Sequence, residues 1–391
     1  MTLVFKKCSY AVSSGGLLHD VDIAVERGRV SGIGTGLGGG EEIDCQGLVA
    51  LPGLANAHTH LSHMYAPPKT PAPTWERHHE DAPQREVAEL ALRLALIQAL
   101  ESGTTLVADT TAHPDLLQRI AGEVGVKVIS AVPWGTLSGW KGGVVLGSLE
   151  EAVEHSEEIR ERVASSQQAL IFLHVANDRS QLYAAKTKYG RFPIELLDSL
   201  GLLTPRTVLV NPGWASSWEL RLVGERGARV VYAPMADALT SSGGMLPVRE
   251  LASNGVTAGL CSETPLIGQT LDMLDVTRAF LILQRELFWE RGLTTLGAMS
   301  IATRGGYSAL SVEGGVIEEG SVADMVLVAS ELARFKGVDP ERLLLSLSTA
   351  NIVYVLVDGK VVLEPSRKEQ LEAVKRSTLE RLLDRLDPTR L

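Results

Sequence analysis

Residues 48–63 read LVALPGLANAHTHLSH, an apolar run that ends in a His-x-His pair. Residues two apart in a strand project from the same face, so the imidazoles of His58 and His60 should point to one side. Two neutral imidazoles side by side supply half of a metal site. Pro52 and Gly53 favour a turn just before the strand. An isolated His-x-His is more often structural, so the rest of the chain must decide between the two interpretations.

Composition restricts the class of protein. The 391 residues are 45% hydrophobic but only 5% aromatic, so the apolar content is mostly aliphatic. Aliphatic side chains suit a buried parallel sheet covered by helices. The net charge is −10 and no long basic run occurs. This balance argues against nucleic acid or an anionic membrane as a partner and is ordinary for a soluble cytoplasmic enzyme.

Cysteine use and the N-terminus indicate the compartment. Cys8, Cys45 and Cys261 are odd in number and far apart, which favours neither a disulfide framework nor a cysteine-only metal site. The first residues lack the apolar core of a signal peptide, and no apolar stretch approaches ~20 residues. We therefore expect a soluble protein of the cytoplasm.

Histidine placement limits the choice of metal ligands. All nine histidines lie at or before His174. Any ligand from the second half of the chain must therefore be a carboxylate or Cys261. A histidine at a strand end is more often structural than catalytic, but His174 follows a His-x-His in the same chain, which favours a functional role.

Strands and helices alternate through the middle of the chain, which predicts a parallel α/β domain. The predicted strands are residues 105–108, 126–132, 169–173, 208–210, 230–232 and 256–260. Between residues 134 and 148 there is room for only a short strand, near 143–146, and no full helix. An eight-stranded barrel needs that short strand, so one βα unit should be reduced.

Both chain ends have a different pattern. Residues 2–49 and the stretch after about residue 310 read as β structure, and Asp358-Gly359 favours a type I′ hairpin turn. Apolar residues at helical spacing then predict a C-terminal amphipathic helix. The proline-rich loop 64–83 carries His79 and Glu80, and it is either a solvated loop or a lid over a site.

At this point the chain resembles the amidohydrolase superfamily, in particular its nucleoside-analogue deaminase and triazine hydrolase group. The resemblance rests on the strand motif at 52–61, on the region from 174 to 211, and on residues 302–303 and 320–328. It implies a (β/α)8 TIM-like barrel and a small β-sandwich formed by both chain ends. The implied division is 1–50 and 311–366 for the sandwich, 51–310 for the barrel, and 367–391 for a final helix.

The resemblance also implies a metal site. His58 and His60 match the ligands of the first strand, His174 matches a ligand on the fifth, and Glu263 stands where the family has an aspartate on the eighth. That acid would both bind the metal and accept a proton from water, which makes Glu263 the expected catalytic residue. Three histidines and one carboxylate suit one divalent ion, with zinc favoured and iron as the alternative.

Three positions depart from the family pattern. Asn177 stands where the group has a proton-shuttling glutamate, and Asn211 and Trp214 stand where it has histidines. Losing positioned acid–base catalysis costs ~10²–10⁴-fold in rate, or about 3–5 kcal/mol. We expect Asn177, Asn211, Trp214 and His79 to bind substrate instead, with His79 or Glu80 of the loop able to supply an acid.

Two functions follow from these observations. The first is a metal-dependent hydrolase that acts through activated water on a C–N or related bond of a small cyclic amidine or aminated heterocycle. The resemblance implies a homodimer, because dimers are common among the relatives. The second is a catalytically impaired relative with a binding or regulatory role, in which the Glu263 carboxylate would point away from the histidines. A small zinc nucleobase deaminase is excluded because no Pro-Cys-x-x-Cys occurs.

Overall fold

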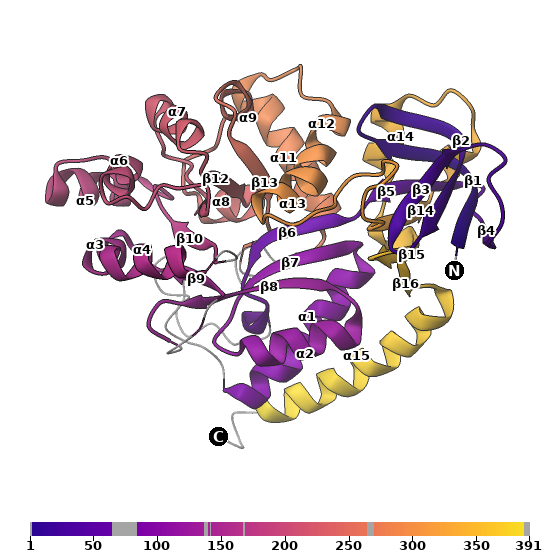
Figure 1. The fold of residues 1–391 in the computed structure, drawn as a ribbon, viewed down its shortest axis with the longest axis horizontal. Coiled ribbons are helices and arrows are strands. Elements are labelled where there is room, and N and C mark those ends of the chain that lie inside the picture. Colours follow the sequence, from indigo (N-terminus) through magenta and orange to yellow (C-terminus); the bar gives the residue numbers. More distant parts are fainter. Residues whose placement is uncertain are drawn as a thin grey trace.

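Eight parallel strands form the central sheet of this computed structural model, which describes residues 2–64, 84–136, 140, 142–166, 169–263 and 270–386. The strands follow one another in sequence order around the sheet (Figure 1). They are β6 (Leu54–Thr59), β7 (Thr104–Thr110), β8 (Lys127–Pro133), β9 (Gly143–Leu146), β10 (Ile171–His174), β11 (Thr207–Val210), β12 (Arg229–Tyr232) and β13 (Thr257–Leu260). The short segment at 143–146 therefore supplies the fourth strand.

The sheet closes because its first and last strands meet. Asn56 donates from Nδ2 to the Ser262 hydroxyl at 2.7 Å and accepts from the Ser262 backbone N–H at 3.0 Å. Beyond them, Thr59 and Glu263 form a parallel β-bridge. The predicted TIM-like barrel is confirmed.

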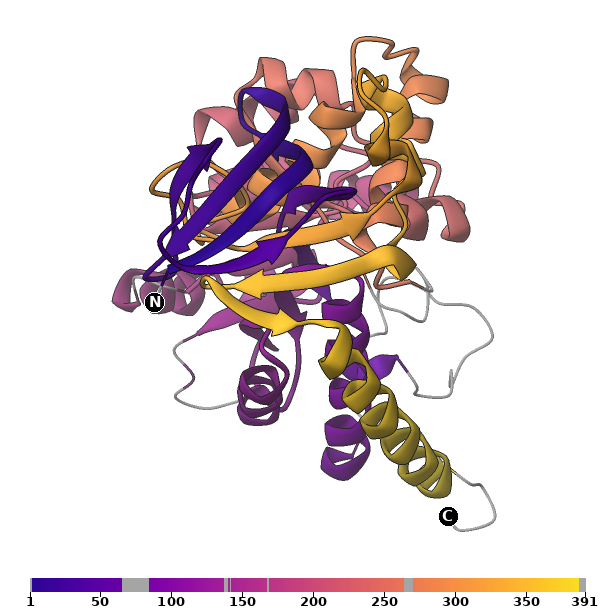
Figure 2. The same cartoon turned by 90° about the vertical axis from the view of Figure 1, so that its right-hand side faces the viewer.

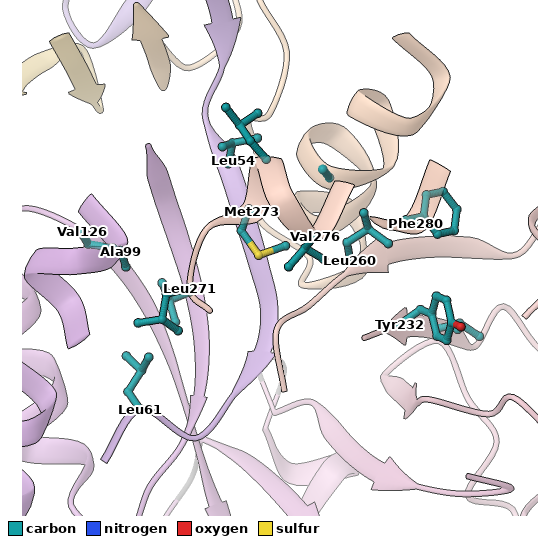
Figure 3. Close-up of a cluster of buried hydrophobic side chains, with 14 of the residues drawn as sticks. Leu54, Leu61, Ala99, Val126, Tyr232, Leu260, Leu271, Met273, Val276 and Phe280 are labelled. Atoms are coloured by element: carbon teal, nitrogen blue, oxygen red, sulfur yellow. The ribbon is translucent and has the colours of Figure 1, made fainter. Parts of the chain in front are cut away.

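Two apolar layers hold the barrel together. Alternate strand residues such as Ala57, Phe172 and Val210 fill its interior, where small side chains predominate near the first strand. The other strand face packs against the surrounding helices, and Figure 3 shows part of that layer, with Leu260, Met273 and Phe280 among its members.

Helices cover the outside of the barrel, and several begin where the sequence supplies a cap. Ser148 accepts the Glu151 backbone N–H at the start of α3 and so caps that helix. The helices that follow the strands are α1 (Arg85–Glu101), α2 (Pro114–Val124), α3 (Leu149–Glu154), α4 (Ser156–Ser165), α5 (Arg179–Tyr189), α6 (Pro193–Ser199), α7 (Ser217–Glu225), α8 (Pro234–Thr240), α9 (Val248–Ser253), α11 (Met273–Phe288), α12 (Thr295–Ser300) and α13 (Gly306–Ala309).

The two chain ends build a second, mixed sheet beside the barrel (Figure 2). Its order is β16-β15-β14-β5-β1-β2-β3, with β4 also paired to β1. The strands are β1 (Thr2–Ser13), β2 (Gly16–Glu26), β3 (Arg29–Gly34), β4 (Glu41–Asp44), β5 (Leu48–Pro52), β14 (Met325–Ala329), β15 (Ile352–Val357) and β16 (Lys360–Leu363). Asp358 and Gly359 have φ of 50° and 72°, as a type I′ turn requires.

A buried carboxylate joins the two sheets. Asp324, fully buried just before β14, accepts hydrogen bonds on Oδ2 from Lys127 Nζ of β8 and from the Tyr307 hydroxyl, each at 2.7 Å. Its Oδ1 accepts the backbone N–H of Asp358 at 2.7 Å. Tyr307 also lies within the barrel's interior cluster, so this network ties the barrel to the terminal sheet.

The C-terminal helix α15 (Pro365–Leu386) lies along α1, as Figure 1 shows. Leu382 is buried against Leu90 and Leu94 of α1, and Lys375 pairs with Glu101 at 2.7 Å. Among the described residues, none of the helices combines the length and apolar character needed to cross a bilayer.

Candidate metal centre and active site

Four side chains from three barrel strands converge at the carboxyl-terminal mouth of the barrel. His58 lies near the end of β6 and His60 just after it, His174 is the last residue of β10, and Glu263 follows β13. In barrels of this kind the active site lies at this face, because the loops after the strands gather there. The sequence prediction thus selected four residues that the fold brings together.

The ligand atoms of this set lie within 4.8 Å of one another. The Nε2 atoms of His58, His60 and His174 stand 3.7, 3.5 and 3.8 Å from oxygens of the Glu263 carboxylate. Four ligands placed tetrahedrally at ~2.0–2.1 Å from zinc lie about 3.3–3.4 Å from each other. The donor types and spacings therefore fit one divalent ion with little movement.

The carboxylate of Glu263 faces all three imidazoles, and all four side chains are buried, the most exposed being His174 at 3%. A buried site of low dielectric strengthens the interaction of these groups with a cation. The binding or regulatory alternative required a carboxylate that points away from the histidines, and these distances contradict that requirement.

Three of the ten described non-glycine residues with a positive φ follow barrel strands at the same mouth. Ala176, Asn211 and Glu263 have φ of 51°, 52° and 62°, although none is glycine. A left-handed backbone costs alanine or glutamate about 1–2 kcal/mol, whereas asparagine tolerates it better. Strain of this kind persists where the surrounding structure fixes a residue for function. At Glu263 the backbone N–H donates to the His58 carbonyl at 3.2 Å, which joins the acid to the strand that carries two of the histidines.

Asn177 is fully buried and its amide orientation is fixed. Its Nδ2 donates to the Val210 carbonyl at 3.2 Å, and its backbone N–H donates to Gln181 Oε1 at 3.1 Å. Its Oδ1 has no hydrogen-bond partner within the described part of the chain.

Asn211, which follows the neighbouring strand β11, differs from Asn177 in that a donor and not an acceptor lacks a partner among the described residues. It is fully buried, and its Oδ1 accepts the Ala233 backbone N–H at 2.6 Å. Its Nδ2 has no hydrogen-bond partner among the residues described. Leaving buried polar groups unpaired costs about 1–3 kcal/mol each. The two buried amides therefore leave one acceptor, Asn177 Oδ1, and one donor, Asn211 Nδ2, without a partner among the described residues.

Trp214 lies in the loop after β11, half-buried, and is held at both ends. Its backbone N–H donates to the Ala176 carbonyl, and its indole Nε1 donates to the Ser242 carbonyl, each at 2.9 Å. Trp214 thus joins the loop after β10, through its backbone, to the loop after α8, through its indole. His79 and Glu80 lie outside the described residues, so their part in a lid stays a prediction.

Sequence reasoning missed Asp237, a buried acid at the same mouth. Asp237 lies in α8, directly after β12, and its side chain is 3% exposed. Burial raises its pKa well above the ordinary value, the neighbouring Ser242 hydroxyl opposes that rise, and the charge of Glu263 adds to it. The one local indication of Asp237 in the sequence was Pro234, which starts a helix directly after a barrel strand.

A second buried acid, Asp109, is at the end of β7. Its Oδ1 accepts the Leu61 backbone N–H at 2.6 Å, so it fixes the chain just after His60. Burial raises its pKa well above the ordinary value, opposed by that hydrogen bond. Its place at a strand end was visible in the sequence, but its bond to Leu61 was not.

Comparisons with known proteins agree with this geometry. A family model described as "Amidohydrolase family" matches residues 49–169 and 155–362. The chain is 28% identical over 394 residues to 5-methylthioadenosine/S-adenosylhomocysteine deaminase 2 of Archaeoglobus fulgidus, covering 92% of this chain and 90% of that protein.

Two solved structures share the fold. One is an adenosine deaminase from Xanthomonas campestris with bound zinc, with a TM-score of 0.82, 20% identity, and coverage of 97% of this chain and 98% of that one. The other is atrazine chlorohydrolase from Arthrobacter aurescens TC1 complexed with zinc, with a TM-score of 0.80, 20% identity, and coverage of 96% and 99%. At these identities the likeness shows the fold alone.

Proposed function

The chain belongs to the amidohydrolase family, and from this premise we propose that it is a metal-dependent hydrolase that removes the amino group from a small aminated heterocycle. The observation that carries the proposal is the set of His58, His60, His174 and Glu263, whose ligand atoms lie within 4.8 Å of one another at the barrel mouth. We propose one zinc ion for this site, with iron as the alternative.

A divalent ion held by these four residues supplies Lewis-acid chemistry that lowers the pKa of water from 15.7 toward about 7. Glu263 then serves as the base that takes the first proton from the attacking water. Burial of the set excludes bulk water, which preserves the strength of these interactions.

The two buried amides support a heterocycle with an amidine edge. Asn211 Nδ2 offers an N–H to a ring nitrogen, and Asn177 Oδ1 accepts from an N–H of the substrate. Adjacent acceptor and donor atoms of this kind occur where a ring nitrogen stands beside an amino-bearing carbon. Adenosine-type nucleosides carry this edge, and relatives whose names include adenosine derivatives lend it weight.

Metal analysis combined with a substrate panel tests the proposal. Purified protein is assayed with adenosine, 5-methylthioadenosine, S-adenosylhomocysteine and amino- and chlorotriazines, and its zinc and iron contents are measured. We expect stoichiometric metal and ammonia release from at least one amino compound. His58→Ala should lose both, whereas His19→Ala, an exposed histidine of the terminal sheet, should lose neither. Stoichiometric metal without turnover of any panel member would contradict the proposal.

Assembly and location remain predictions. The expected homodimer is checked by light scattering on purified protein, and the cytoplasmic location by cell fractionation. The expected division into a barrel at 51–310 and a terminal-sheet unit from 1–50 and 311–366 is checked by limited proteolysis.

A further inference from the structure

A third histidine, His63, follows the His-x-His pair on the same short stretch of chain. His60 and His63 are three residues apart, and Leu61–His63 form the 3-10 helix η1 just after β6. In a 3-10 helix, side chains three positions apart eclipse one another. His60 is the N-cap of η1, so the local geometry should bring the imidazole of His63 over that of His60.

The two imidazole rings lie one over the other, as this geometry predicts. Their centroids are 5.7 Å apart, and their planes differ by 17°. The ring of His60 meets His58 at 5.1 Å and 84°, and it meets His174 at 6.4 Å and 33°. Of these three neighbours, His63 is the nearly parallel one. Offset parallel rings at such distances attract each other, so His63 supports one face of the His60 imidazole.

The turn that carries His63 is fixed at several points. The His63 N–H donates to the His60 carbonyl at 3.0 Å, which is the bond that closes a 3-10 turn. Leu61 is fully buried, and its N–H donates to Asp109 Oδ1 of β7 at 2.6 Å. η1 also packs against α1. A turn held in this way carries a His63 side chain that is 8% exposed.

The contact between the rings matters because of the task of His60. Its Nε2 stands 3.5 Å from an oxygen of Glu263 and has to keep its lone pair directed at the ion. Rotation of the ring about the Cβ–Cγ bond changes both the position and the direction of Nε2. A ring that is stacked on a fixed neighbour loses this contact when it rotates. Groups that orient a metal ligand raise the affinity for the metal.

We propose that His63 is a positioning residue of the metal centre, whose imidazole stacks on the ring of His60 and holds the His60 Nε2 toward the ion. The proposal rests on the four-residue metal site of the function proposed above. His63 does not belong to the set whose ligand atoms lie within 4.8 Å of one another. Its contribution therefore comes from the face of its ring and not from a bond between its nitrogen and the ion.

Two substitutions separate the aromatic ring of His63 from its hydrogen-bonding groups. His63→Phe keeps an aromatic face and loses both nitrogens, whereas His63→Gln keeps a donor and an acceptor and loses the ring. The Kd for zinc is measured against a chromophoric chelator. In His63→Gln it should rise about 3- to 10-fold, the size of effect that an aromatic pair produces. In His63→Phe it should stay within about 2-fold of wild type, because the stack is kept.

Cobalt-substituted protein gives a second readout, which reports the ligand geometry itself. The visible absorption bands of bound Co²⁺ depend on how its ligands are arranged. The bands of His63→Phe should match those of wild type, whereas those of His63→Gln should shift or broaden because the His60 ring can turn. His19→Leu is the matched control, since His19 also contacts an aromatic ring, that of Tyr10 at 4.7 Å, but lies in the terminal sheet. It should leave both the Kd and the bands unchanged.

Each outcome supports or overturns the proposal. Wild-type affinity and bands in His63→Gln would overturn it. Equal losses in His63→Phe and His63→Gln would also overturn it, because an aromatic face would then not be enough to hold His60. Urea unfolding of each metal-free variant checks that the fold is kept, and His63→Leu repeats the ring-free test with an apolar side chain. Wild-type protein without stoichiometric metal would overturn the proposed function, whereas metal-loaded wild type with unaffected variants would overturn the role of His63 alone.

Discussion

The Thr59 hydroxyl donates a 2.7 Å hydrogen bond to the backbone carbonyl of Glu263. Thr59 stands between His58 and His60, so the strand that carries two imidazoles also fixes the peptide that carries the carboxylate. Glu263 is held there with φ of 62°, a conformation that the chain would not adopt unsupported. The contacts between the first and last strands that close the barrel therefore also hold Glu263 beside the two histidines.

Removing this hydroxyl should weaken metal binding without removing a ligand. Thr59→Val preserves shape but loses the donor to the Glu263 carbonyl. Groups that orient metal ligands typically contribute 10–100-fold in affinity, so we expect a loss of about that size. A zinc titration against a chromophoric chelator measures it. Thr59→Ser, which keeps the hydroxyl, should bind as wild type does, and equal affinity in both variants would contradict the role of this bond.

Asn211→Asp should impair recognition of an amidine edge. The new side chain still accepts the Ala233 N–H, but its second atom becomes an acceptor and repels a ring nitrogen. A lost donor at a buried site costs about 1–3 kcal/mol, so kcat/KM for adenosine should fall about 10- to 100-fold. Asn254→Asp, at the end of α9, is the matched control. An unchanged kcat/KM would remove Asn211 from the substrate-binding residues.

Asp324→Ala should destabilise the whole protein. It leaves Lys127 and the Tyr307 hydroxyl without their shared buried acceptor. Breaking a buried pair from one side costs about 3–5 kcal/mol. Urea unfolding should show a lower midpoint at an unchanged slope. In Glu313→Ala, which breaks a pair with Arg29 between exposed side chains, the cost should be under about 1 kcal/mol. Similar midpoints for the two variants would count against the Asp324 network.

Two glycine-to-alanine changes should have opposite effects. A Cβ on Gly306 would lie 2.6 Å from the Ala55 Cβ inside the barrel, so Gly306→Ala should cost about 1–3 kcal/mol of unfolding free energy. A Cβ on Gly122, in helix α2, meets nothing within 4 Å. Gly122→Ala should therefore gain about 0.5–1 kcal/mol. Chemical denaturation measures both, and a stabilised Gly306→Ala would refute the tight packing at that position.

The sequence predicts the parts of this molecule that depend on local pattern. The His58–His60 pair, the strand ending at His174 and the Asp358-Gly359 turn each carry their signal within a few residues. Even the short strand at 143–146 is predictable, because strands on both sides of it require a neighbour.

Positions that depend on distant contacts are harder to predict. Glu263 enters the candidate site only through the family resemblance, since nothing near it in the sequence indicates a ligand. Asp237 was missed because its significance comes from burial and from neighbours 26 or more residues away in the chain, Asn211 and Glu263. The orientation of the Asn177 and Asn211 amides likewise follows from backbone groups of adjacent strands, which no local pattern reveals.

The central claim is that His58, His60, His174 and Glu263 share one divalent ion. A crystal of the metal-loaded protein, measured on both sides of the zinc absorption edge, tests it directly. The account predicts one strong anomalous peak per chain at about 2.0–2.2 Å from the three Nε2 atoms and a Glu263 oxygen. A metal-loaded protein whose anomalous peak lies elsewhere, or whose Glu263 carboxylate turns away from the ion, would contradict it.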